Sequence, residues 1–215
     1  MALYRGKEIP EDAVVLDELE ATKYIWNVVS DWEHTADVWA LRYASYILGG
    51  VSAVSGIMIN RFYRGKLKLG TYGYFASVLP ISAMPALLTA MFHRHLVSTD
   101  MLLMKRETCP ICYELRSGAI QAGLGIGYPM VLGPLSALML ANRYNTARIP
   151  ELVHGPRVMF KFLRKITKPF IGTLTFLAVS QLFISSALTY FEMRNIYLLR
   201  MKIMEIEAKH TADNS

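Results

Sequence analysis

The chain has 215 residues, of which 53% are hydrophobic and 19% are charged, and its mean hydropathy is positive. This length allows one domain with a sizeable core, but the composition is unlike that of a soluble protein. The charges are segregated, and they leave four uncharged runs in which no helical face is polar beyond scattered Ser, Thr and Gln. A soluble bundle would have a polar face on each helix, so the sequence predicts an all-α polytopic membrane protein.

The first 42 residues form an acidic segment that resembles neither a secretory signal nor an Arg-rich mitochondrial presequence, so we expect internal targeting. Large apolar residues in this segment follow the three-four spacing of one helical face: Ile25, Val28, Trp32 and Trp39. Two interpretations fit this stripe equally. It is either half-sunk in the membrane interface, where Trp is favoured, or a docking helix for a protein partner.

Four transmembrane helices are predicted within residues 43–191, because the uncharged runs there are 18 to 26 residues long. A helix needs about 20 predominantly apolar residues to cross a hydrocarbon core of about 30 Å. After the last run, apolar residues at helical spacing predict a helical tail available to a partner. The predicted elements are the N-terminal amphipathic segment 1–42, the spans 43–60, 71–92, 117–142 and 170–191, and the C-terminal extension 192–215.

Small residues at regular spacing predict close helix packing in the first and third spans. Prolines interrupt the second and third spans, and broken helices of this kind also occur in transporters. No predicted span contains an ionisable residue, however, as a transport pathway usually would. The sequence therefore favours packing over transport, with the packing residues Gly49, Ala53, Ser52, Gly56, Gly123 and Gly127.

The distribution of bases predicts the topology. Loops 61–70 and 143–169 together hold eleven bases and one acid, whereas segment 1–42 holds nine acids and four bases. By the positive-inside rule, the basic loops face the cytoplasm or its equivalent, and the termini face the opposite compartment. Interleaved bases and aromatics in HGPRVMFKFLRKITKP also suit nucleic acid, but beside a span they are more typical of attraction to anionic lipid headgroups. We expect a lipid bilayer as partner and no nucleic acid.

The only cysteines of the chain are Cys109 and Cys112, in the stretch ETCPICYELRSG. A structural zinc site needs four ligands, and His93 and His95 in the same loop lack the usual histidine spacing, so they are expected to cap the second span. A thiolate is favoured at the helix start after Pro110, but a thioredoxin-like βαβ setting is missing. The sequence is compatible either with an unreactive disulfide between the two cysteines or with two free thiols. No catalytic residue, cofactor or metal is predicted.

The run T-C-P-I-C-Y-E-L-R-S-G, followed by G-Y-P-M and A-N-R-Y, resembles the transmembrane protein 126 family. The resemblance is specific over about residues 107–144, and a later T-K-P before the last span is also similar. The four-span layout with a long third run agrees with that family. Besides the two cysteines, the matching positions are Arg116, Ser117, Gly118, Tyr128, Pro129, Ala141, Arg143 and Tyr144.

The resemblance implies a non-enzymatic protein of the mitochondrial inner membrane that assists assembly of the membrane arm of respiratory complex I. Subunits of that arm and other assembly factors would be its partners. Of two vertebrate paralogues, one works with the ECSIT-containing assembly complex on the proximal part of the arm, and the other works on the distal part. The basic loops would then face the matrix, and the termini and cysteine loop the intermembrane space, which favours a Cys109–Cys112 disulfide. Small-solute transport and thiol-disulfide chemistry at the CxxC pair are the alternatives.

Overall fold

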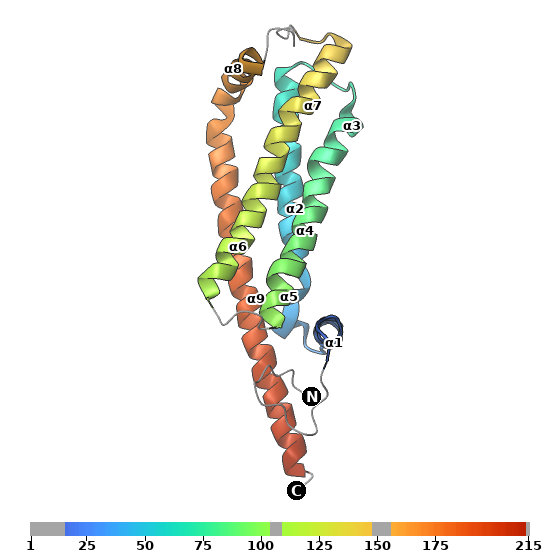
Figure 1. Ribbon diagram of the computed structural model, residues 1–215, viewed down its shortest axis with the longest axis vertical. Helices are drawn as coiled ribbons and strands as arrows, with labels where there is room; N and C mark the ends of the chain where they lie inside the picture. The colour runs from blue at the N-terminus through green and yellow to red at the C-terminus, as the bar shows by residue number, and fades with distance from the viewer. Residues whose placement is uncertain (1–15, 104–108, 148–155, 214–215) are drawn as a thin grey trace.

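The computed structural model describes residues 16–103, 109–147 and 156–213, and these residues form helices and turns without a strand. Four long helical segments run side by side and alternate in direction (Figure 1). The first is α2 (Thr35–Lys66) and the last is α9 (Ile171–Asp213). The second comprises α3 (Tyr74–Val78), η1 (Leu79–Ala83), α4 (Met84–His93), η2 (Arg94–Ser98) and α5 (Thr99–Leu102), and the third comprises α6 (Pro110–Ala122), η3 (Gly123–Gly127) and α7 (Tyr128–Tyr144).

Two amphipathic helices lie across the bundle near its opposite ends, and Figure 1 shows both nearly end-on. One is α1 (Glu18–Asp31). The other is α8 (Pro156–Thr167), which leads through the 3₁₀ turn η5 (Lys168–Phe170) into α9. We call these two ends of the bundle the α1 end and the α8 end. The last turns of α9 extend past the α1 end.

Three helical segments of the described residues are long and apolar enough to cross a membrane: Tyr74–Leu102, Pro110–Tyr144 and Arg157–Ile206. They contain the second, third and fourth predicted spans. The first predicted span lies in α2, whose run YASYILGGVSAVSGIMIN is diluted by Gly and Ser. Small and polar residues suit α2 because it is the inner helix of the bundle, in contact with α4, α7 and α9. That α2 is a fourth span stays a prediction.

The apolar stripe predicted between Ile25 and Trp39 is not one continuous helical face. Helix α1 ends at Asp31 and α2 begins at Thr35, so the chain turns within the stripe. Ile25 is buried in a core cluster with Val97 of the second segment and Leu199 of α9. Trp39 packs against Phe191 at a ring distance of 5.5 Å, and Val28 and Trp32 line an open hollow beside α9. Ile25 thus attaches α1 to the rest of the chain, whereas a role of the stripe at the membrane interface or with a partner stays a prediction.

A second apolar cluster holds the α8 end together. Tyr63 of α2, Ala141 of α7 and Phe170 of η5 are buried there, and the Tyr63 hydroxyl lies 2.8 Å from the Thr167 hydroxyl. Arg64, one of the bases counted in the first basic loop, is also buried. Its guanidinium donates hydrogen bonds of 2.8 Å to the carbonyl oxygens of Gly70 and Tyr72 and thereby closes the turn between α2 and α3.

Three π-helical turns, η1, η2 and η3, interrupt the second and third segments. Two of them precede Pro85 and Pro129, which have no amide hydrogen for the carbonyl four residues earlier. No proline follows η2. There, the Thr99 hydroxyl donates a hydrogen bond of 2.9 Å to the carbonyl of Arg94, five residues earlier. Single π turns of this kind are frequent at functional sites.

Candidate functional site, a polar junction at the second π turn

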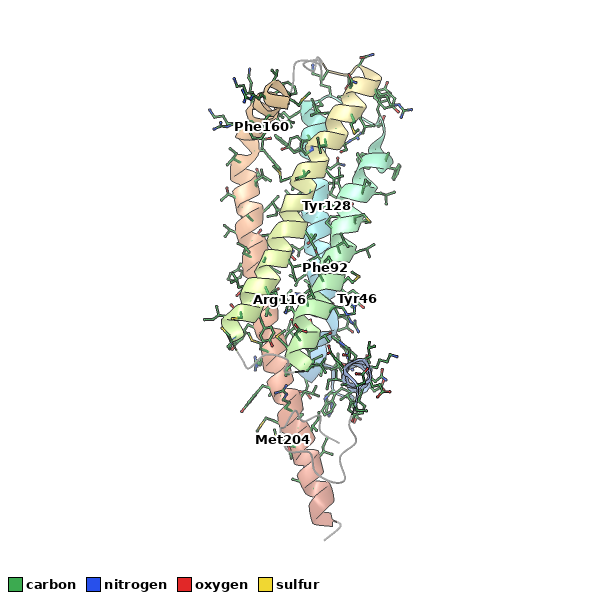
Figure 2. All side chains as sticks on the ribbon, viewed as in Figure 1. Tyr46, Phe92, Arg116, Tyr128, Phe160 and Met204 are labelled. Atoms are coloured by element: carbon green, nitrogen blue, oxygen red, sulfur yellow. The ribbon has the colours of Figure 1, made fainter. Side chains whose placement is uncertain are left out.

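Five polar side chains from three segments meet inside the bundle next to η2, and each is at most 1% exposed. Both carboxylate oxygens of Glu192 in α9 have partners: one accepts a hydrogen bond of 2.8 Å from the Ser98 hydroxyl, and the other lies 3.0 Å from His93 Nε2. The other ring nitrogen of His93 lies 3.1 Å from the Ser117 hydroxyl of α6. We call this set the polar junction: His93, Ser98, Ser117, Ser185 and Glu192. Phe92 and Arg116, labelled in Figure 2, mark its level.

The π turn explains why His93 and Ser98 reach the same carboxylate. Five residues along an α-helix rotate a side chain by about 500°, which leaves it about 140° away from its starting direction. A π turn has one more residue in its hydrogen-bonded ring, so residues five apart come to lie on one side. In this structure His93, which directly precedes η2, and Ser98, the last residue of η2, bind different oxygens of Glu192.

The same turn attaches α1 through a second pair of residues five apart. The Thr99 hydroxyl accepts a hydrogen bond of 3.1 Å from the indole nitrogen of Trp26. The guanidinium of Arg94 lies over the same indole, 4.1 Å from the ring centroid, a favourable cation–π distance. The next residue, Asp100, accepts a hydrogen bond of 2.7 Å from Arg116. The η2 turn thus joins α1, α6 and α9 by side-chain contacts.

A second polar layer lies deeper in the bundle along α2. The Gln121 side chain donates to the Ser52 hydroxyl at 3.1 Å, and Gln181 donates to the hydroxyl of Ser55. Both glutamine Oε1 atoms are buried without a hydrogen-bond partner among the described residues. A Cβ on Gly125 would lie 2.5 Å from Gln181 Oε1, so the bare backbone of η3 leaves room for this amide.

The polar junction is suited to locking helices together. The order Ser117, His93, Glu192 has the residue types of a nucleophilic triad, but all three side chains are almost inaccessible, and none lines the hollow beside α1 and α9 or the one on α8. Each member is bonded to another member, as buried polar groups between membrane helices require. The two ring nitrogens of His93 thus connect Glu192 of α9 with Ser117 of α6.

Sequence reasoning missed His93 and Glu192 because it ended the second and fourth spans one residue before them, at Phe92 and Phe191. The helices continue, so the premise that no ionisable residue lies inside them is wrong. His93 does not cap a span end; it is 1% exposed and bonded to Glu192. One signal was available. The second and fourth predicted spans end on the same side of the membrane, which places the residues that follow them at a similar depth.

The predicted packing residues divide into two groups. A Cβ on Gly49 would lie 2.7 Å from the carbonyl oxygen of Ala86, and one on Gly56 would lie 2.3 Å from that of Ile81. Ser52 is fully buried and Ala53 is half-buried. Gly123 and Gly127 are exposed and touch no other helix, so their predicted role in packing within the chain is wrong. The buried glycine of that turn is Gly125, which lies midway between them.

The family-motif residues serve different contacts. Arg116 and Ser117 take part in the contacts around η2, and a Cβ on Gly118 would lie 3.3 Å from the Leu182 side chain. Tyr144 stacks on Tyr72 at 5.0 Å. Among the others, Pro129 and Ala141 are buried, Tyr128 is half-buried and Arg143 is exposed.

The two cysteines are exposed thiols at the start of α6, and the implied disulfide is not formed in this structure. A hydrogen bond with the Cys112 side chain lowers the pKa of the Cys109 thiol, and backbone hydrogen bonds from Cys112 and Ile111 lower it further. Within the described parts of the chain, no group of three or more His, Cys, Asp and Glu side chains is placed to hold a metal ion.

Comparison with known proteins identifies the family. The sequence matches the Transmembrane protein 126 family over residues 23–207. The chain belongs to this family. It is 40% identical to Transmembrane protein 126 of Drosophila melanogaster over 209 residues, which cover 96% of this chain and 94% of the fly protein.

Two mammalian proteins are more distantly related to this chain. Transmembrane protein 126A of Rattus norvegicus is 28% identical over 136 residues, or 63% of this chain and 66% of the rat protein. Complex I assembly factor TMEM126B, mitochondrial, of Mus musculus is 28% identical over 173 residues, or 76% of this chain and 68% of the mouse protein. No solved structure matches the chain.

Proposed function

We propose that this protein is a non-catalytic assembly factor for the membrane arm of respiratory complex I in the mitochondrial inner membrane. The observation that carries the proposal is its membership of a family in which the mouse relative is a mitochondrial complex I assembly factor. The protein acts as a scaffold that binds hydrophobic subunits of the arm before the complex closes around them. Four helices cross the membrane, with the basic loops in the matrix and the termini and cysteine loop in the intermembrane space.

A surface suited to such binding runs along the outer side of α9. Large apolar side chains recur there every seven residues, and each is more than half exposed: Phe176, Phe183, Tyr190, Tyr197 and Met204. A seven-residue apolar repeat is the pattern by which one helix packs along another. We call these residues the α9 stripe. Met204, labelled in Figure 2, lies on the part of α9 that extends past the bundle, so the stripe reaches partners inside and outside the bilayer.

Two experiments test this function. After deletion of the gene, native gels should show a loss of complete complex I and accumulation of its membrane-arm intermediates, while an unchanged complex I level contradicts the proposal. A photo-reactive residue placed at Phe183 or Tyr197 should crosslink to membrane-arm subunits. The matched control is Met139 of α7, which is equally exposed, at 75%, but lies outside the stripe. Protease protection of a C-terminal tag in mitoplasts tests the topology.

Thiol-disulfide chemistry at Cys109 and Cys112 is the second candidate function, favoured by the lowered pKa of Cys109 and by the exposure of both sulfurs. Replacing both cysteines by Ser separates it from the scaffold function. Normal complex I in cells that express the double variant at the wild-type level argues for the scaffold alone. Loss of complex I at that same protein level argues for a redox role.

A further inference from the structure

Helix α8 has two contrasting faces. Its apolar side packs on the cluster at the α8 end through Met159, Phe162, Leu163 and Ile166. The rest of the helix is strongly basic, and the sequence has no acid between Pro156 and Phe170. None of the bases in α8 and η5 forms an ion pair with another described residue. Five bases therefore remain on or next to the outer side of α8: Arg157, Lys161, Arg164, Lys165 and Lys168.

An open hollow lies among these bases, lined by Arg157, Phe160, Lys161 and Arg164. The three bases are four and three residues apart, the spacing that places side chains in one row along a helix. Phe160, labelled in Figure 2, is 69% exposed although it is a large apolar side chain. The hollow thus combines three positive charges with one unpartnered aromatic ring.

The position of α8 limits what can fill this hollow. The helix lies across the end of the bundle and is connected through η5 to the apolar beginning of α9 (Figure 1). A basic amphipathic helix at this level of a membrane protein lies in the plane of the lipid headgroups. Lipid phosphates complement its charge, and acyl chains beside the headgroup complement the exposed ring of Phe160.

We propose that the α8 hollow is a binding site for the headgroup of an anionic phospholipid. Arg157, Lys161 and Arg164 bind the phosphate, and Phe160 contacts the glycerol and upper acyl region. The site would fix the height and tilt at which the α8 end enters the bilayer. This inference depends on the membrane character of the protein and not on its role in complex I assembly.

Native mass spectrometry of the full-length purified protein, incubated with phosphatidylglycerol or with phosphatidylcholine, tests the site. Wild type should retain phosphatidylglycerol preferentially. The variant R157Q/K161Q/R164Q should bind it about fivefold less tightly per base removed, or roughly a hundredfold in total. The matched control R61Q/R143Q/K165Q removes three exposed bases of the same end outside the hollow and should retain the lipid.

Three results would overturn the site: equal retention of the two lipids by wild type, unchanged retention by the hollow variant, or an equal loss in the control. Displacement of the lipid by inorganic phosphate alone would also contradict a lipid site. The conservative variant R157K/R164K keeps the charges and should keep most of the binding, so a loss of binding there would contradict an electrostatic site. All of these side chains are exposed, and the apolar face that holds α8 is unchanged in every variant.

Discussion

The second helical segment contains two π turns that contact their neighbours in opposite ways. At η1 the contact is backbone to backbone, because Gly56 of α2 lies so close to the Ile81 carbonyl that no side chain fits between them. At η2 the contacts are between side chains, with a carboxylate, an imidazole and hydroxyls that bond one another. A chain can therefore hold membrane helices together either by removing side chains or by pairing polar ones.

The two kinds of contact differ in what they tolerate. The η1 contact depends on shape alone and should be sensitive to any added carbon atom. The η2 contact depends on partners, since a buried polar group becomes costly when its partner is removed. Mutations at the η1 and η2 contacts should therefore differ in how much they destabilise the protein and in which conservative substitutions preserve its stability.

Glu192→Ala should have the largest effect, because it leaves His93 and Ser98 buried without their partner. Each buried polar group left without its partner costs about 1–3 kcal/mol of the free energy of unfolding, so the two together should cost about 2–6 kcal/mol. Denaturant titration of the purified protein in detergent micelles measures this loss, and Glu192→Gln, which keeps an acceptor oxygen, should lose less. The control is Glu205→Ala, whose exposed pairing with Lys209 should leave the midpoint unchanged. A midpoint for Glu192→Ala that matches this control would contradict the importance of the junction.

Gly56→Ala tests the η1 side and should have the next largest effect. The added Cβ would lie 2.3 Å from the Ile81 carbonyl oxygen, so α2 and η1 must separate. Overpacking of this kind costs about 1–3 kcal/mol. Gly50→Ala in the same helix meets nothing within 4 Å and should instead stabilise by about 0.5–1 kcal/mol, the helix propensity of Ala over Gly. Equal unfolding midpoints for the two variants would remove the distinction between the two π turns.

A double-mutant cycle on Asp100 and Arg116 measures a partly exposed contact of the η2 side. The two side chains are 14% and 31% exposed, and the bond between them is 2.7 Å long. We expect a coupling of about 1 kcal/mol between Asp100→Asn and Arg116→Gln, well below the loss for Glu192→Ala. A coupling of zero would mean that α6 is held at this level by Ser117 and by apolar packing alone.

The smallest effect is expected at the start of α6, where the side chains of Cys112 and Cys109 are hydrogen-bonded to each other. Cys112→Ala should raise the pKa of the Cys109 thiol, because it removes the hydrogen bond that contributes most to the lowered pKa. In the fully reduced protein, the pH at which alkylation of Cys109 reaches half its maximal rate should move upward, and the rate at neutral pH should fall a few-fold. Ile111→Ala keeps the backbone amide and is the control. A mass measurement without reductant shows whether the implied disulfide forms.

A structural feature could be predicted where the sequence alone determines it. Three membrane helices were visible because long runs without charge are a property of composition. The close approach of Gly49 and Gly56 was visible because small residues at fixed spacing need no knowledge of the partner helix. The η2 turn was not visible, since no proline marks it and the sequence does not show that the Ser98 and Thr99 hydroxyls bond the carbonyls five residues earlier.

Errors arose where a boundary had to be chosen. A rule that counts charges ends a helix at the first ionisable residue, and so it excluded His93 and Glu192, which are bonded to each other in the interior. Alternate glycines at 123, 125 and 127 gave no indication of which ones face a neighbour, because the π turn changes the rotation of the chain there. The break between α1 and α2 was missed because apolar spacing continues through Trp32, although the helix does not.

The 43 residues of α9 form an unbroken helix of about 65 Å at a rise of 1.5 Å per residue, roughly twice the thickness of a hydrocarbon core. The bundle holds this helix as far as Leu199, which is buried in the cluster with α1, and the remaining residues extend for roughly 21 Å beyond it. A change in the tilt of the membrane-embedded part would therefore move the end of α9 sideways. Contacts made by that end would be sensitive to how the helix lies in the bilayer.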